Sequence, residues 1–225
     1  MPVQLRFKDR TEAGQLLADQ LQSYASHPDA LLLAIPRGGV PVAYEMSQRL
    51  GIPWDIWPAR KLGMPGHPEL AIGAISRGGV RFFNREVMGE HEVAPAELEQ
   101  VMEREYQELQ RREHLFCGDR PRVNPQDRTV IVVDDGIATG ASLRAALASI
   151  RLEKPRRLVV AVPVAPPSTC RVLEAEVDDL ITLIRPSPLY SVGAWYQNFQ
   201  QVSDREVQAF LARSRAVQAT RLQEG

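Results

Sequence analysis

The 225-residue sequence predicts an α/β fold: a doubly wound, mainly parallel sheet of five strands with helices on both faces. Short, continuous apolar runs rich in Val, Ile and Leu recur along the chain, as strands covered on both faces require. Segments with helical spacing of apolar residues separate these runs, which implies crossover connections and parallel pairing. Gly-rich polar loops follow several runs, and the carboxyl ends of parallel strands are where ligands bind.

Composition favours one globular domain over residues 1–225. The hydrophobic content is 44%, the charged content is 24% and the net charge is −1, so the chain has no basic excess suited to a nucleic acid. Two cysteines are too few for a disulfide framework, and the four histidines lie too far apart in sequence for a zinc site. The N-terminus does not resemble a signal peptide and no apolar run is long enough to cross a membrane, so we expect a cytoplasmic protein.

The first elements follow from capping and from apolar runs. Asp9 and Glu12 form a capping-box pattern that predicts a helix ending near Ser26. The next predicted elements are a strand over 30–35, a helix over 40–50 and a strand over 54–59. One helix between two strands makes a strand–helix–strand unit, so we expect these strands to pair in parallel.

The middle of the chain has a different character. "KLGMPGHPEL" (61–70) is rich in Gly and Pro and predicts a loop. Residues 71–75 and 80–84 predict a small hairpin with a glycine turn, so we expect residues 62–83 to form a flexible loop and hairpin insertion. Residues 94–116 have apolar residues near helical spacing and predict a long amphipathic inserted helix whose charges form a solvated face.

The last third completes the sheet. The predicted elements are strands over 129–133, 157–162 and 179–184 and a helix over 140–152. Ser203 and Glu206 form a second capping-box pattern, which begins a final helix that ends near residue 220. Because residues 186–225 follow the last strand, we expect them to return across the carboxyl edge of the sheet.

The segment "DDGIATGAS" (134–142) carries the most specific chemistry. Its glycines and small residues let backbone N–H groups point inward at a helix start, where Thr139 and Ser142 add hydroxyl donors for a phosphate. Asp134 and Asp135 would repel that phosphate and instead suit ribose hydroxyls or Mg²⁺. A 5-phosphoribose has both groups. The alternative is a receiver-like or nucleotide-binding domain in which the two aspartates only cap a strand.

These residues carry a family resemblance. "VIVVDDGIATGAS" resembles the phosphoribosyl-pyrophosphate (PRPP) signature of type I phosphoribosyltransferases. "AIPRGGVPVA" resembles the pyrophosphate loop of that family, and "ARKLG" resembles its following basic segment. The chain as a whole, including "GHPELAIGAISRGG" and "VGAWYQNFQQVSD", is similar to a bacterial branch of the family. The resemblance implies the Rossmann-like fold of these enzymes.

The resemblance also implies roles for individual residues. Asp134 and Asp135 would hold the ribose hydroxyls, directly or through Mg²⁺. Arg37 and Lys61 would stabilise the leaving pyrophosphate, and together these are the four expected catalytic residues. The implied substrate-binding residues are Gly38, Gly39, Arg60, Gly136, Ile137, Ala138, Thr139, Gly140, Ala141 and Ser142. Arg77, at the predicted hairpin tip, is expected to be a surface residue.

The implied reaction transfers 5-phosphoribose from PRPP to a nitrogenous base. Pyrophosphate leaves C1 of the ribose, so cations and backbone N–H groups can stabilise it without a protein nucleophile. Water would compete as nucleophile, and residues 62–83 are our candidate lid. The expected partners are PRPP and a small-molecule acceptor, with no nucleic acid or membrane, and the sequence is compatible with a homodimer. Two alternatives stay open: a PRPP-sensing regulatory protein without turnover, and a hydrolase of a phosphorylated ribose compound.

The sequence leaves the acceptor open. Hypoxanthine-type members have an Asp just before the Thr-Gly pair, whereas this chain has Ala138. The C-terminal segment "PSPLYSVGAWYQNF" concentrates aromatic residues, and we expect the ring of Tyr190 or Trp195 to stack on a planar acceptor. For Phe199 we expect a place in a small satellite core under the final helix.

Overall fold

A five-stranded parallel sheet forms the centre of the computed structural model, which describes residues 6–25, 27–91, 93–118 and 123–223. The strands are β1 (Ala30–Ala34), β2 (Trp54–Ile56), β6 (Thr129–Val133), β7 (Arg157–Val164) and β8 (Asp179–Ile184). Their order is β2-β1-β6-β7-β8, and every neighbouring pair is parallel. The predicted fold class is confirmed.

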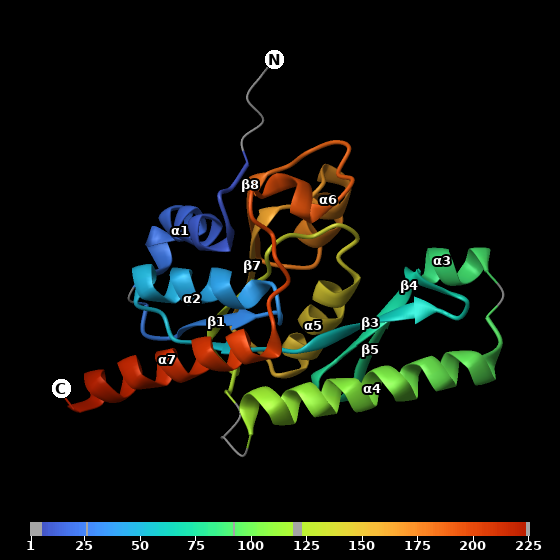
Figure 1. Ribbon diagram of the computed structural model, residues 1–225, viewed down its shortest axis with the longest axis horizontal. Coiled ribbons are helices and arrows are strands. Elements are labelled where there is room, and N and C mark those ends of the chain that lie inside the picture. The colour runs from blue at the N-terminus through green and yellow to red at the C-terminus, as the bar shows by residue number, and fades with distance from the viewer. Residues whose placement is uncertain (1–5, 26, 92, 119–122, 224–225) are drawn as a thin grey trace.

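Helices cover both faces of this sheet (Figure 1). On one face lie α1 (Arg10–Gln20), α2 (Gly39–Leu50) and α7 (Asp204–Gln223), and on the other lie α5 (Ala141–Leu152) and α6 (Pro167–Glu174). Strand β1 explains the continuous apolar runs. Leu32 points into the core under α2 while Leu31 and Leu33 point into the core under α5, so both faces of the strand must be apolar.

Helix α1 begins as predicted but ends early. The Asp9 side chain accepts a hydrogen bond from the Glu12 backbone N–H at 3.0 Å, which caps the first turn. The helix stops at Gln20, and a short 3-10 turn, η1 (Gln22–Tyr24), follows it. The predicted end near Ser26 is therefore wrong.

A second, antiparallel sheet replaces the loop predicted over 61–70. It consists of β3 (Ala59–Met64), β4 (His67–Ser76) and β5 (Val80–Phe83), with helix α3 (Arg85–Glu90) after it and the predicted long helix, α4 (Pro95–Cys117), packed against it. The glycines belong to the hairpin itself. Gly66 has φ +77° in the turn, and a Cβ on Gly63 would overlap the Pro68 carbonyl oxygen, so the strands meet too closely for a side chain there.

Apolar burial explains why this sheet forms. Leu62 and Ile72 pack with Val101 and Leu109 of α4 in a cluster separate from the main core. The Gly and Pro residues indicate a turn here. They do not reveal the packing against α4 that lets the residues on both sides of the turn form strands.

Helix α5 joins the two sheets, because it covers the parallel sheet and also packs against β3, β4 and β5. A buried polar chain crosses this junction. The Trp57 indole N–H donates to Ser149 Oγ at 2.7 Å, Ser149 Oγ lies 2.9 Å from Ser76 Oγ, and Ser76 donates to the Pro58 carbonyl at 3.0 Å.

The C-terminal segment crosses the carboxyl edge of the parallel sheet beside the start of the chain. It contains a 3-10 turn, η3 (Val192–Trp195), and is held by two backbone hydrogen bonds of Phe7, to the Trp195 carbonyl at 2.9 Å and from the Gln197 N–H at 2.8 Å. Glu206 and Ser203 then form the predicted capping box at the start of α7. Among the described residues, the helices are all too short or too polar to span a bilayer.

Candidate active site

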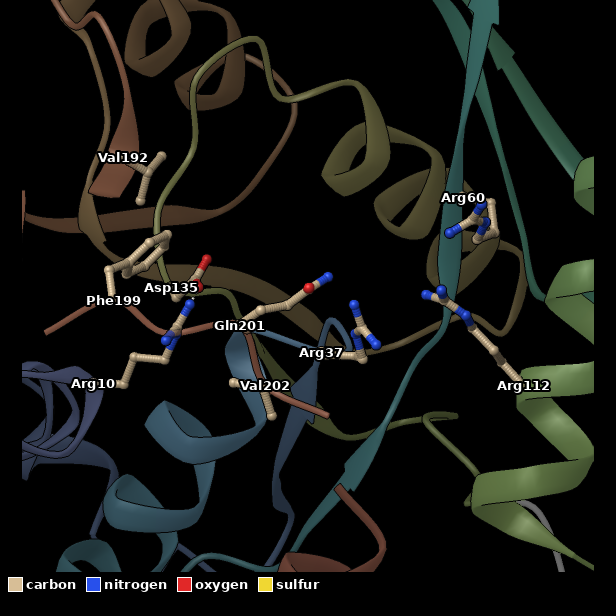
Figure 2. A pocket seen from close by; sticks show the side chains of 10 residues that line it. Arg10, Arg37, Arg60, Arg112, Asp135, Val192, Phe199, Gln201 and Val202 are labelled. Carbon is tan, nitrogen blue, oxygen red and sulfur yellow. Dashed lines mark hydrogen bonds and ion pairs between the residues drawn. The ribbon is translucent and has the colours of Figure 1, made fainter. Parts of the chain in front are cut away.

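One pocket of about 520 Å³ lies at the carboxyl edge of the parallel sheet (Figure 2). It draws side chains from α1, α4, β3, the loops after β1 and β6, and the C-terminal segment. The lining residues are Arg10, Arg37, Gly38, Arg60, Arg112, Asp135, Val192, Phe199, Gln201 and Val202.

The carboxylate pair follows β6 directly. The Asp134 carboxylate accepts a hydrogen bond from the Asp135 backbone N–H at 2.8 Å. Burial, followed by the charge of Asp135, raises the pKa of Asp134 well above its usual range. Burial also raises the pKa of Asp135, while the nearby guanidinium of Arg10 opposes this rise. Two adjacent carboxylates in this environment gain from any ligand that brings a cation or hydroxyl donors.

Arg10 is the resident partner of Asp135, and the sequence analysis missed it. Its Nε donates to Asp135 Oδ2 at 2.7 Å, with side chains that are 11% and 14% exposed. Its Nη1 donates to the Gln200 carbonyl at 2.8 Å, and its guanidinium carbon lies 3.9 Å from the centre of the Phe199 ring. The residue follows Asp9, the cap of α1, so the start of that helix aims it at the pocket.

Glycines bring the predicted pyrophosphate loop against the carboxylates. A Cβ on Gly38 would overlap Asp135 Oδ2, and one on Gly39 would lie 2.5 Å from the Val133 carbonyl oxygen. A larger residue at Gly39 would displace the backbone at the end of β6, and one at Gly38 would displace the Asp135 carboxylate. Arg37 precedes them, lines the pocket, and lies 3.4 Å from Asp204 at the start of α7.

The loop after the carboxylates leads into α5. Gly136 and Gly140 have φ +151° and +76°, which favour glycine, and Gly140 is the cap of the helix. The Ile137 N–H donates to the Val164 carbonyl at 2.8 Å, and the Ala138 carbonyl accepts from Thr169 Oγ1 at 2.7 Å. These bonds hold the loop while the first N–H groups of α5 lack helical partners, as at any helix start, which suits an anion.

Of the basic segment at 60–63, Arg60 reaches the pocket. Its Nε and Nη2 donate to one carboxylate oxygen of Glu105 at 2.9 and 2.6 Å. Lys61 is the next residue of β3, and successive side chains of a strand point to opposite faces. Lys61 is half-buried and is not among the pocket-lining residues.

Two charged residues of α4, Glu105 and Arg112, lie at the pocket side of the helix rather than on a solvated face. Glu105 is only 8% exposed, where it holds Arg60. Arg112 lines the pocket and donates to Glu108 at 2.8 Å. The prediction that the charges of this helix are all solvated is therefore wrong for these residues. Their contacts depend on the packing of α4 against β3, which the sequence pattern does not reveal.

Arg77, expected at the surface, is also buried. It is 8% exposed, stacks on Trp57 with its guanidinium carbon 4.7 Å from the ring centre, and lies 3.4 Å from Glu113 of α4.

The aromatic residues of the C-terminal segment separate into two groups. Tyr190 is 91% exposed, Trp195 packs in the cluster of Phe7 and Tyr196, and neither lines the pocket. Phe199 joins that cluster, as expected, and also lines the pocket. Tyr196 donates its hydroxyl to the Asp135 carbonyl at 2.6 Å, and burial, with the charge of Asp135, raises the pKa of Tyr196.

A carboxylate pair, a helix start suited to phosphate and an arginine-rich pocket have the chemistry that a phosphorylated sugar or nucleotide requires. The comparisons with known proteins are more specific. The family model "Phosphoribosyl transferase domain" matches residues 8–194, and the chain belongs to that family, with the type I phosphoribosyltransferase fold.

Two similar curated proteins come from Mycobacterium tuberculosis strains CDC 1551 / Oshkosh and ATCC 25618 / H37Rv, and both carry the name "Putative phosphoribosyl transferase". Each is 40% identical over 208 residues, which is 92% of this chain and 47% of the relative, so the chain spans about half the length of these relatives. The crystal structure of TT1426 from Thermus thermophilus is 39% identical, with a TM-score of 0.75 over 92% of this chain and 98% of that one.

Proposed function

We propose that the protein transfers 5-phosphoribose between PRPP and a nitrogenous-base acceptor, with pyrophosphate as the leaving group. The close approach of Gly38 to Asp135 carries the proposal, because it brings the loop of Arg37 and one member of the carboxylate pair together in one pocket. Membership in a family of transferase enzymes supports the reaction class.

The three parts of PRPP would lie along this edge of the sheet. The 5-phosphate would bind the backbone of residues 137–142 at the start of α5. The ribose hydroxyls would bind Asp134 and Asp135, and the pyrophosphate would bind Arg37 and the Gly38–Gly39 backbone, with Arg60 beside it. In this arrangement Lys61 would act from the opposite face of β3 and stabilise the leaving group through the field of its charge.

The carboxylate pair fits Mg²⁺. Among the described residues no group of three or more His, Cys, Asp and Glu side chains is arranged to hold a metal by itself. Mg²⁺ usually binds one or two carboxylates and takes its other ligands from substrate phosphates and water, so Asp134 and Asp135 would share the ion with PRPP. When bound, the ion neutralises charge that develops on the leaving oxygens.

The residues of the site would support a substitution at C1 without a covalent protein intermediate. As the bond to pyrophosphate breaks, the ribose ring becomes positive, and the carboxylates beneath it favour that charge. The acceptor would attack from the face opposite the pyrophosphate, at the Val192 end of the pocket. The β3–β4 hairpin is the proposed lid against water, and Tyr190 or Trp195 would reach a planar acceptor only if the C-terminal segment closes over the pocket.

Calorimetry with PRPP tests this proposal. Wild-type protein should bind PRPP with Mg²⁺, and the Asp134→Asn, Asp135→Asn variant should lose at least about tenfold in affinity for each charge-assisted hydrogen bond removed. Asn can still accept the Asp135 N–H, so we expect the variant to fold. The matched control is Asp178→Asn, Asp179→Asn, an adjacent pair at the start of β8, on the opposite edge of the sheet.

Unchanged PRPP affinity in the Asp134, Asp135 variant would overturn the assignment. Pyrophosphate release from PRPP in the presence of a panel of bases distinguishes an enzyme from a sensor. Tight PRPP binding without release for any base would favour the PRPP-sensing alternative.

A further inference from the structure

The far end of the pocket, away from Asp135, is formed by two arginines from outside the parallel sheet. Arg60 comes from β3 and Arg112 from α4, and Figure 2 shows them side by side at the end opposite Val192. Arg37 lies between this pair and Asp135. A row of guanidinium groups therefore extends beyond the Gly38–Gly39 loop.

The balance of charge in the pocket favours a multivalent anion. Its lining contains four arginines, namely Arg10, Arg37, Arg60 and Arg112, and a single carboxylate, Asp135. The partners of the two outer arginines, Glu105 and Glu108, do not line the pocket. They pair with the guanidinium groups through contacts of 2.6 and 2.8 Å. An arginine has five N–H donors, so each retains donors for a ligand.

We propose that Arg112 of α4 and Arg60 of β3 form an outer pyrophosphate subsite that binds the terminal phosphate of the PRPP diphosphate. The inference rests on the proposed function. Asp135 marks the ribose end of the pocket, and the leaving group and the acceptor must lie on opposite faces of C1. The cationic end therefore takes the diphosphate, and the Val192 end is left for the acceptor. The inserted helix α4 thus takes part in substrate binding.

A neighbouring residue provides a matched control. Arg111 and Arg112 both pair with Glu108, through contacts of 2.7 and 2.8 Å. Arg112 is 16% exposed and lines the pocket, whereas Arg111 is 53% exposed and does not. Removing either charge takes one guanidinium partner from Glu108. Arg111 also lies 3.6 Å from Asp204, but only Arg112 lines the pocket.

The experiment is calorimetry with inorganic pyrophosphate, PRPP and ribose 5-phosphate, each with Mg²⁺, on wild type, Arg112→Gln, Arg112→Lys and Arg111→Gln. Arg112→Gln should weaken pyrophosphate and PRPP binding by about tenfold or more and leave ribose 5-phosphate binding within about twofold. Arg111→Gln should change all three by less than about twofold. Arg112→Lys should recover part of the loss, since it keeps the charge but not the planar fork.

Three outcomes would overturn the subsite: wild-type pyrophosphate affinity in Arg112→Gln, an equal loss in Arg111→Gln, or an equal loss of ribose 5-phosphate binding. In the first two cases, PRPP binding by the wild type would still support the proposed function. A wild-type protein that binds neither PRPP nor pyrophosphate would instead contradict the proposed function itself.

Discussion

Asp135 is the residue on which the contacts of the site converge. Its carboxylate pairs with Arg10 from α1, and its carbonyl accepts the Tyr196 hydroxyl from the C-terminal segment. Its Oδ2 also occupies the space that a side chain on Gly38 would need. One residue at the end of β6 therefore positions the start of the chain, the loop after β1 and the segment over the pocket.

Arg10→Gln should destabilise the protein by about 1–3 kcal/mol, because it leaves a poorly solvated carboxylate without its cation. Adding Asp135→Asn should recover part of this loss, since the amide no longer needs a counter-charge. Urea unfolding of both single variants and the double variant gives the coupling free energy of the pair.

An exposed ion pair provides the control for this cycle. Arg49 lies 2.6 Å from Asp19, with side chains 45% and 50% exposed, and such pairs contribute less than about 1 kcal/mol. If the coupling free energy of Arg10 and Asp135 is no larger than that of Arg49 and Asp19, Arg10 does not stabilise the buried carboxylate as we expect.

At the scale of elements, α4 performs two tasks on two faces. Its apolar side, with Val101 and Leu109, packs against the antiparallel sheet. Its polar side presents Arg112 to the pocket and anchors it through Glu108. Hydrogen bonds from Arg111, and then from Arg112, lower the pKa of Glu108 to about 2 from its usual 4.5.

Glu108→Gln should lower the stability of the protein near neutral pH by at most about 1 kcal/mol, because solvent screens much of the pair. The folded-state pKa lies below the unfolded one, so the stabilisation is present above about pH 4.5 and is lost as the pH falls towards 2. Melting temperatures of wild type and variant, measured by circular dichroism, should differ near neutral pH and converge in acid. A difference that keeps its full size near pH 3 would contradict this account.

Across the molecule, α5 connects the two sheets because it packs against both. The loops after β1 and β6 of the parallel sheet supply Arg37, Gly38 and Asp135 to the pocket, while the antiparallel sheet supplies Arg60 and supports α4. Ser149 lies at the junction, where its hydroxyl accepts the Trp57 indole N–H and contacts Ser76. A buried polar contact therefore links the two sheets that supply the pocket.

Ser149→Ala should cost about 1–3 kcal/mol, because it leaves the buried Trp57 N–H without an acceptor. The contrasting control is Thr182→Val. The buried Thr182 hydroxyl has no hydrogen-bond partner among the described residues, so its removal should be neutral or stabilising. Denaturant unfolding measures the free energy of unfolding of both variants. Equal losses of stability in the two would show that the Trp57–Ser149 hydrogen bond does not stabilise the junction.

Local sequence patterns were enough to predict the parallel sheet and to locate the carboxylate pair at its edge. Strands covered on both faces need continuous apolar runs, and the phosphate loop and carboxylate pair are contiguous in residues 134–142, so neighbouring residues carry the information. The capping boxes at Asp9 and Ser203 were predictable for the same reason. Each of these features depends on residues a few positions apart.

The side chains that complete the pocket could not be predicted, because they come together only when distant elements pack. Arg10 meets Asp135 across 125 positions of sequence. Arg112 reaches the pocket because α4 packs on an antiparallel sheet, of which the sequence predicted the β4–β5 hairpin but not the strands over 61–70. Because side chains alternate along β3, Arg60 lines the pocket and Lys61 does not. Such contacts arise when apolar surfaces from distant elements are buried together, and local patterns of residues do not contain that pairing.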